Sequence, residues 1–252
     1  MQSKIALITG GSRGLGKNAA LHLAKNGNDI IITYFSKKEE ADKVVAEVEA
    51  MGRKAVAIQS DAGDIKAIDS FIANVSNVLK EKWGREKFDH LVNNAGHGGS
   101  IPFAAATEAD FDRFSDVHFK GVFFLTQKAL PIMNDGGSIV NLSTGTTRFA
   151  NPGYSIYASM KGAVEILTKY LAKDLGARGI NVNIVAPGPV ETDFNSAAIR
   201  SNAALKERLA TVTALGRVGE PDDIGGVIAF LCSPEGHWIN GQRIEASGGI
   251  NL

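Results

Sequence analysis

The stretch Thr9-Gly10-Gly11-Ser12-Arg13-Gly14-Leu15-Gly16 decides how this chain folds. It ends a short apolar run, Ile5–Thr9, and opens a helical pattern with alanine and leucine on one side. Glycines at such a place let the backbone turn tightly and approach a diphosphate closely. The free N–H groups at the helix N-terminus then favour the bound anion. Strand, glycine-rich turn and helix in this order predict a dinucleotide site, although a glycine-rich turn can also occur without a ligand.

Around this turn, apolar runs rich in isoleucine and valine alternate with helical patterns. Because the runs themselves show little alternation, they predict strands buried on both faces of a parallel sheet. Strand, helix and strand in repetition predict right-handed crossovers, and no linker or internal repeat interrupts them. We expect a single α/β domain over residues 1–252: a Rossmann-like, doubly wound parallel sheet of about seven strands with helices on both faces. The expected strands are Ile5–Thr9, Ile30–Thr33, Ala55–Gln59, His90–Asn93, Ser138–Leu142, Asn181–Ala186 and Arg243–Ala246.

Two helices and one irregular stretch stand out between these strands. Ala41–Met51 and Ile65–Lys82 carry apolar residues at helical spacing with charged residues opposite. Val190–Thr213 has the least regular pattern and follows the sixth expected strand. Loops after the strands of doubly wound folds line the ligand crevice. Residues 190–213 are therefore expected to form a mobile substrate lid.

The composition narrows the function. The 252 residues include 27 Lys and Arg and 27 Asp and Glu, whereas a nucleic-acid binder usually carries a basic excess. A single cysteine, Cys232, allows no intrachain disulfide and fits a reducing cytoplasm. No apolar run reaches the roughly 18 residues of a membrane span, and the early run at Ile5 leaves no room for a signal peptide. We expect a cytoplasmic protein without nucleic-acid or membrane partners.

The end of the second expected strand indicates which nicotinamide cofactor binds. Dinucleotide folds that use NAD carry an acidic residue there, which binds the adenosine ribose. Here Tyr34 stands at that place, so the position holds no carboxylate that would repel a 2′-phosphate. Arg13 in the glycine turn, with Ser36 and Lys37, can contact that phosphate; Arg13 and Lys37 can also be ordinary solvated charges. The pattern predicts NADP(H) rather than NAD(H).

A tyrosine and a lysine form the expected proton-transfer pair. Tyr157-Ala158-Ser159-Met160-Lys161 places Tyr157 and Lys161 four residues apart, on one face of a helix. The ammonium is expected to lower the phenol pKa from its ordinary value of about 10 towards the working pH. Tyr157 would then act as a general acid or base near the working pH. Tyr34 and Lys38 share the spacing, but they lie at the adenosine end, so we interpret that pair as accidental.

The G-x-x-x-G-x-G spacing of Gly10, Gly14 and Gly16, together with the chain length, resembles the classical short-chain dehydrogenase/reductase family. The resemblance spans nearly the whole chain. It implies an NADP(H)-dependent oxidoreductase that moves hydride between the nicotinamide and a carbonyl or alcohol, of ketone reductase or 3-oxoacyl reductase type. It also implies a homotetramer or homodimer, because the apolar helices around 119–129 and 163–171 resemble the family's dimer faces; alternatively these faces are intrachain core.

The same resemblance supplies further cofactor contacts at strand ends. Asp61-Ala62 resembles the adenine contact, and Asn93-Asn94-Ala95-Gly96 resembles the N-N-A-G motif. In Pro187-Gly188-Pro189-Val190-Glu191-Thr192, the threonine would meet the nicotinamide carboxamide, while Lys161 would bind the nicotinamide ribose. The expected cofactor residues are Gly10, Ser12, Arg13, Gly14, Leu15, Gly16, Tyr34, Ser36, Lys37, Asp61, Ala62, Asn93, Ala95, Gly96, Tyr157, Lys161, Pro187, Gly188, Val190 and Thr192.

Two positions depart from the family pattern. By the spacing to Tyr157, the family's catalytic serine falls on Thr144, which keeps a hydroxyl. Ser143 is adjacent, but neighbouring strand residues point to opposite faces, so we choose Thr144 unless both hydroxyls are structural. The family's active-site asparagine is replaced by His118, which is either a second titrating group in the relay or a packed, hydrogen-bonded core histidine. The expected catalytic residues are Tyr157, Lys161, Thr144 and His118.

Some questions stay open at this level. The other histidines show no metal-ligand spacing, so no metal is expected. The changes at His118 and Thr144 leave a non-catalytic NADP-binding or scaffold protein as the alternative to an enzyme. Kinship of fold does not identify the small-molecule carbonyl or alcohol substrate. The expected pocket, Gly98–Ile101, Thr146–Tyr154 and Val190–Ile199, offers a moderately apolar ligand the side chains of Phe149, Tyr154 and Phe194.

Overall fold

Seven parallel strands form one sheet, in the order β3-β2-β1-β4-β5-β6-β7. The computed structural model describes residues 3–252, apart from the side chains of Asn195 and Ser196. The strands are β1 (Ile5–Ile8), β2 (Asp29–Tyr34), β3 (Ala55–Gln59), β4 (Phe88–Asn93), β5 (Met133–Leu142), β6 (Asn181–Pro187) and β7 (Arg243–Ala246). The expected doubly wound parallel sheet is confirmed.

One strand begins well before its expected start. β5 starts at Met133 instead of Ser138, and the register of its pairing with β4 shifts between Phe88 and His90. The added segment contains Asn134 and two glycines, which favour turns over strands. The sequence pattern therefore does not reveal this extension, which the pairing with β4 produces.

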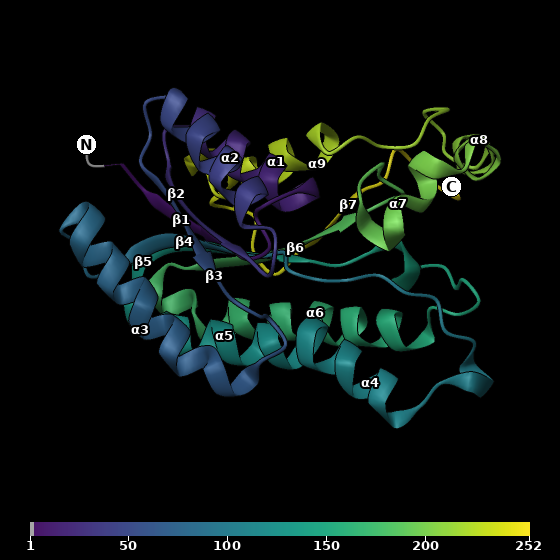
Figure 1. Ribbon diagram of the computed structural model, residues 1–252, viewed down its shortest axis with the longest axis horizontal. Helices are drawn as coiled ribbons and strands as arrows, with labels where there is room; N and C mark the ends of the chain where they lie inside the picture. Colours follow the sequence, from purple (N-terminus) through teal and green to yellow (C-terminus); the bar gives the residue numbers. More distant parts are fainter. Residues whose placement is uncertain (1–2) are drawn as a thin grey trace.

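Helices cover both faces of the sheet (Figure 1). On one face α1 (Gly14–Lys25), α2 (Lys38–Ala50) and α9 (Asp222–Leu231) pack into a core with β1, β2 and β6. On the other face α3 (Ile68–Val78), α5 (Gly121–Ala129) and α6 (Ser155–Asp174) form a second core around Leu91 and Ile139. The expected helix 65–82 comprises a 3-10 turn, α3 and a π-helical turn at Leu79–Trp83.

The strand order determines where a ligand can bind. β1 lies between β2 and β4, so the chain reverses its direction of travel across the sheet at β1. In open α/β sheets the crevice at the carboxyl ends of the strands, beside such a reversal, is the ligand site. The turns after β1, β4, β5 and β6 all meet at this edge.

The stretch 190–213, which has the least regular sequence pattern, is largely helical. Two short helices, α7 (Phe194–Ser201) and α8 (Ala203–Thr211), occupy it and lie near the C-terminus at one end of the molecule (Figure 1). The Asn202 side chain accepts a 2.9 Å hydrogen bond from the Leu205 N–H and caps α8. Capping and helix-forming residues such as alanine and lysine produce these helices without a clear apolar periodicity. Across residues 3–252, no helix has the length and apolar character needed to cross a membrane.

Candidate active site

The glycine turn after β1 leaves no room for a side chain at Gly10 or Gly16. Gly10 has φ +65°, and a Cβ there would lie 2.9 Å from the Cα of Ala95 in the turn after β4. A Cβ on Gly16 would lie 2.3 Å from the Gly10 carbonyl oxygen. Asn94 fixes the arrangement, because its Nδ2 donates to the carbonyl oxygens of Thr9 (2.9 Å) and Gly10 (3.0 Å). The backbone is therefore free to approach a ligand at this turn, as a diphosphate requires.

The N-terminus of α1 offers unpaired donors to an anion. Its N-cap residue, Arg13, makes no side-chain capping bond, and the first turn holds no acidic residue. The Arg13 side chain is 57% exposed, with its Nη1 3.9 Å from a carboxylate oxygen of Asp193. Thr192 lies beside Gly14, where a Cβ would contact its side chain at 3.7 Å. Free N–H groups, the helix dipole and an exposed guanidinium suit phosphate groups.

Two of the three residues expected to contact the cofactor at the end of β2 lie at the surface. Ser36 and Lys37 are exposed, whereas the Tyr34 side chain packs into the core beside α1 and α2. Lys38 forms a 2.7 Å ion pair with Asp42, and this hydrogen bond raises the pKa of Lys38. The tyrosine and lysine of this second Y-x-x-x-K pair therefore belong to separate environments, as expected for an accidental match.

A cavity opens beside the ends of β1, β3 and β4. The expected adenine contacts Asp61 and Ala62 line it together with Asn93 and Ala95. The side-chain amide of Asn93 donates to Asn141 Oδ1 (2.8 Å), which holds the ends of β4 and β5 together. Apolar side chains from α3 and α5 form part of its wall.

The turn after β6 faces the glycine turn. Pro187 ends β6, and the Gly188 N–H donates to the Ala246 carbonyl (3.0 Å). Val190 forms a β-bridge with Gly219. Thr192 is buried, and its hydroxyl accepts from the Phe194 N–H (3.2 Å). The structure thus places these expected cofactor residues at one edge with the glycine turn.

Tyr157 and Lys161 lie on the inner face of α6 and are both buried. The Thr144 side chain lies close enough to the phenol hydroxyl to lower the pKa of Tyr157. Lys161 Nζ donates to the Leu142 carbonyl oxygen (2.8 Å) and lies 5.9 Å from the centroid of the Tyr157 ring. These three side chains bring a hydroxyl, a phenol and an ammonium together at the end of β5.

The expected lowering of the Tyr157 pKa does not occur in this structure. Burial raises the pKa of Tyr157 to about 12, and the hydrogen bond from Thr144 offsets only part of this rise. Burial also lowers the pKa of Lys161 to about 8. Because Lys161 bonds a main-chain carbonyl instead of the phenol, removal of both groups from water outweighs their attraction.

Of the two neighbouring hydroxyls, Thr144 and not Ser143 meets Tyr157. Ser143 points the other way and donates to a carboxylate oxygen of Glu165 on α6. This division follows from strand geometry, in which successive side chains leave opposite faces.

His118 is a packed, neutral histidine. It lies in a π-helical turn, Asp116–Lys120, is fully buried, and its Nε2 is 2.8 Å from the His97 carbonyl oxygen. Burial, and then the charge of Lys161, lower its pKa to about 2. Its ring lies 5.1 Å from the Tyr157 ring, edge to face. Of the two readings of His118, the structure supports the core residue and not a group that titrates near neutral pH.

Aromatic rings surround the phenol. Phe114, Tyr154 and Phe194 lie with ring centroids 6.4, 6.4 and 6.2 Å from that of Tyr157. Phe114 and His97 were not anticipated from the sequence. Phe114 stands four residues before His118 on the same helical face, which is a signal that could have identified it.

The three segments of the expected pocket only partly converge on Tyr157. The Ile101 N–H donates to the Gly153 carbonyl (2.8 Å), which joins segments 98–101 and 146–154. Phe149 instead packs on Gly145, where a Cβ would lie 2.8 Å from its ring. Within the described part of the chain, no group of three or more His, Cys, Asp or Glu is placed to hold a metal ion.

Comparison with known proteins extends these findings. A family model described as enoyl-(acyl carrier protein) reductase matches residues 10–251. The 3-oxoacyl-[acyl-carrier-protein] reductase FabG of Staphylococcus aureus is 38% identical over 252 residues, covering 99% of each chain. The solved angucycline C-6 ketoreductase LanV with bound NADP is 37% identical, with a TM-score of 0.94 over 99% of this chain and 96% of that one. A short chain dehydrogenase of Burkholderia cenocepacia J2315 in complex with NADP is 38% identical, with a TM-score of 0.90 over 100% and 99% of the two chains.

Proposed function

This chain belongs to the classical short-chain dehydrogenase/reductase family, and from this we propose that Tyr157 is the proton donor of a carbonyl reduction. The protein is an NADP(H)-dependent oxidoreductase acting on C=O and CH–OH groups. The observation that carries the proposed role is the buried phenol, which lies beside the Thr144 side chain and one helical turn from Lys161. Nothing in the site favours a non-catalytic NADP-binding protein, because each expected catalytic side chain except His118 retains a reactive polar group.

The chain's own residues prepare the substrate oxygen for reduction. NADPH, when bound, supplies the hydride to the carbonyl carbon. Thr144 donates a hydrogen bond to the carbonyl oxygen, and Tyr157 gives that oxygen its proton. Lys161 stabilises the phenolate that remains, since an adjacent ammonium favours the charged form of a phenol. Burial of Tyr157 and Lys161 excludes water from this transfer.

The lining of the pocket supports a ketone with a flat apolar body as substrate. Three aromatic rings and the neutral His118 surround the phenol, and none of them carries a charge to bind a polar substrate. Stacked and edge-to-face contacts with such rings favour aromatic ligands. Aryl ketones, aliphatic 3-oxoacyl thioesters and an enoyl thioester, each tested with NADPH, separate the alternatives. We expect the highest kcat/KM with aryl ketones; turnover of the enoyl thioester alone would overturn the assignment.

The remaining cofactor contacts are part of the proposal. We assign the diphosphate to the glycine turn, the adenine to the cavity beside Asp61 and Ala62, and the carboxamide to Thr192. The 2′-phosphate is assigned to Arg13, Ser36 and Lys37, which are exposed polar side chains in the glycine turn and just after β2.

Replacement of Arg13 by alanine tests the assignment of the 2′-phosphate. We expect KM for NADPH to rise about 10- to 100-fold, because a charged hydrogen bond contributes roughly 1.5–3 kcal/mol. KM for NADH should stay within about twofold, since NADH lacks that phosphate. Initial rates with both cofactors give the result, with Lys173→Ala, an exposed cation at the end of α6, as the control. Equal losses with NADPH and NADH would contradict the assignment.

The pH profile of kcat/KM for reduction should show a single fall, on the alkaline side. Lys161 acts in its protonated form and has a pKa lowered to about 8, so its contribution is present below that pH and is lost above it. Tyr157, with a pKa raised to about 12, keeps its proton throughout. We expect kcat/KM to be level below pH about 8 and to fall above it, and Lys161→Arg to displace the fall to higher pH. A limb near pH 6.5 that His118→Asn removes would contradict the neutral state of His118.

The proposal also covers the oligomeric state and the cellular location of the chain. Phe123 and Phe124 on α5, and Ile166 and Tyr170 on α6, are exposed large apolar or aromatic side chains. They support a homotetramer or homodimer built on these helices, which light scattering in solution tests. We further propose one domain over residues 1–252, residues 190–213 as a substrate lid, and a cytoplasmic setting, which the single buried Cys232 fits.

A further inference from the structure

One face of α6 carries four polar side chains at spacings of four, four and three residues. Opposite them lie the last residues of β5 and the residues that follow, 141–144. Residues 141, 142 and 143 each bond to one member of the helical row through a side chain or a carbonyl oxygen, and the Thr144 side chain lies beside a fourth member. Side chains at such spacings share a helical face. The members of the row are Tyr157, Lys161, Glu165 and Thr168.

Glu165 is the member of the row that the proposed reaction does not use. Its Oε1 accepts hydrogen bonds from Ser143 Oγ, from Thr147 Oγ1 (2.7 Å) and from Arg243 Nε (2.8 Å). The side chain is only 18% exposed. A carboxylate removed from water requires such partners, and here two of the three come from the loop that carries Thr144.

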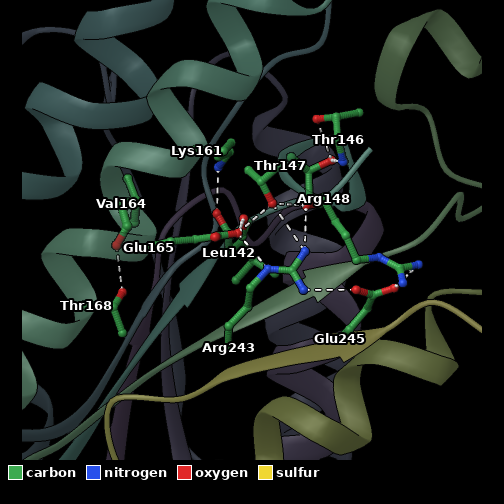
Figure 2. A network of polar contacts seen from close by, with 12 residues as sticks. Leu142, Thr146, Thr147, Arg148, Lys161, Val164, Glu165, Thr168, Arg243 and Glu245 are labelled. Carbon is green, nitrogen blue, oxygen red and sulfur yellow. Dashed lines mark hydrogen bonds and ion pairs between the residues drawn. The ribbon is translucent and has the colours of Figure 1, made fainter. Parts of the chain in front are cut away.

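Arg243, on β7, completes this contact from the other side (Figure 2). Its Nη2 donates to the Thr144 carbonyl oxygen and to Thr147 Oγ1, each at 3.2 Å. Thr144 is extended, with φ −163° and ψ 155°. Its carbonyl is therefore held by Arg243 while its side chain lies beside Tyr157. Glu165 bonds the residues on both sides of Thr144, so the loop is fixed before, at and after the catalytic hydroxyl.

The network continues to the end of the chain. Arg243 Nη1 donates to Glu245 (2.9 Å), which also forms a 3.0 Å ion pair with Arg148 (Figure 2). Arg148 Nη2 donates to the Ile250 carbonyl oxygen (2.5 Å). These contacts anchor Arg243 between two carboxylates, Glu165 and Glu245, so its guanidinium is fixed in position. A planar guanidinium with several partners holds its geometry better than an ammonium would.

We propose that Glu165 and Arg243 form a positioning pair that fixes the Thr144 loop so that its hydroxyl meets the Tyr157 oxygen. The inference rests on the proposed function of Thr144 and Tyr157. Neither Glu165 nor Arg243 needs to contact the substrate or the cofactor. Their loss should therefore lower kcat while the Kd for NADPH stays unchanged, and it should have no effect where the Thr144 hydroxyl is already absent.

A double-mutant cycle tests this coupling. We compare wild type, Glu165→Gln, Thr144→Ala and the double variant by kcat, NADPH Kd and Tm. We expect Glu165→Gln to lower kcat about tenfold, since small displacements of catalytic groups have effects of this order or larger. The double variant should match Thr144→Ala alone, because Glu165 acts through that hydroxyl. Asp135→Asn, which removes the carboxylate partner of Arg178 elsewhere, is the matched control and should leave kcat unchanged.

The outcomes are distinguishable. Unchanged kcat in Glu165→Gln, or losses that multiply in the double variant, would overturn the positioning role. Unchanged kcat in Thr144→Ala would instead contradict the proposed function of Thr144. If Glu165→Gln does not fold, Arg243→Lys takes its place in the cycle, because lysine keeps the charge and loses the planar contact to the Thr144 carbonyl. A lower kcat in Arg243→Lys, with a double variant that matches Thr144→Ala alone, then supports the proposal. An unchanged kcat, or losses that multiply in the double variant, overturns it.

Discussion

Replacing Tyr157 by phenylalanine is expected to lower kcat for ketone reduction by about a thousandfold. The substitution removes one oxygen atom, and with it the group proposed to give a proton to the substrate oxygen; general acids contribute roughly 10²- to 10⁴-fold. The ring remains, so its edge-to-face contacts with His118 and Phe114 are kept. Single-turnover oxidation of NADPH, measured by its loss of absorbance, follows the chemical step directly.

Cofactor binding separates this chemical effect from damage to the fold. We expect the Kd for NADPH in Tyr157→Phe to stay within about threefold of wild type, because the glycine turn and the adenine cavity are untouched. Tyr170→Phe is the matched control: it removes the same atom from an exposed tyrosine on the same helix, and kcat should not change. Near-normal turnover by Tyr157→Phe would exclude the phenol as the proton donor.

The features that the sequence reveals are those set by neighbouring residues. The glycine turn, the tyrosine and lysine four residues apart, and the choice of Thr144 over Ser143 each follow from local geometry: a tight turn, a helical repeat and a strand repeat. The central strands could be predicted because strands buried on both faces leave continuous apolar runs. The start of β5 could not, because its first residues enter the sheet through pairing with β4.

The features that the sequence conceals depend on distant residues. Glu165 and Arg243 are 78 positions apart, and no pattern in either sequence segment predicts their ion pair. A charged residue one turn after Lys161, on the same face, was nevertheless a signal that this face is polar. The pKa of Tyr157 was predicted in the wrong direction because spacing shows that a lysine is near but not how deeply both groups are buried. Burial is a tertiary property, and it outweighs their attraction here.

A change of Gly16 to alanine is expected to weaken NADPH binding about 100-fold or more. The added methyl carbon would lie 2.3 Å from the Gly10 carbonyl oxygen and 2.4 Å from Asn94 Nδ2. The Gly10 contact is main chain, so it cannot be relieved by turning a side chain, and the turn must move away from the start of α1. That movement displaces the N–H groups assigned to the diphosphate, and a 100-fold loss corresponds to about 2.7 kcal/mol. Fluorescence titration with NADPH measures the Kd.

The comparison with Gly176→Ala decides whether the loss of NADPH binding is specific to the glycine turn. Gly176 is exposed, and a Cβ there meets no atom within 4 Å. The Gly176→Ala variant should therefore bind NADPH with the wild-type Kd. Overpacking at Gly16 should also destabilise the fold by roughly 1–3 kcal/mol, so Tm is measured beside Kd to show that the variant is folded at the titration temperature. A folded Gly16→Ala protein that binds NADPH with the wild-type Kd would mean that the diphosphate does not approach the backbone at this turn. In that case the free N–H groups of α1 would not be the anion site, and the assignment of Arg13 to the 2′-phosphate would lose its geometric basis as well.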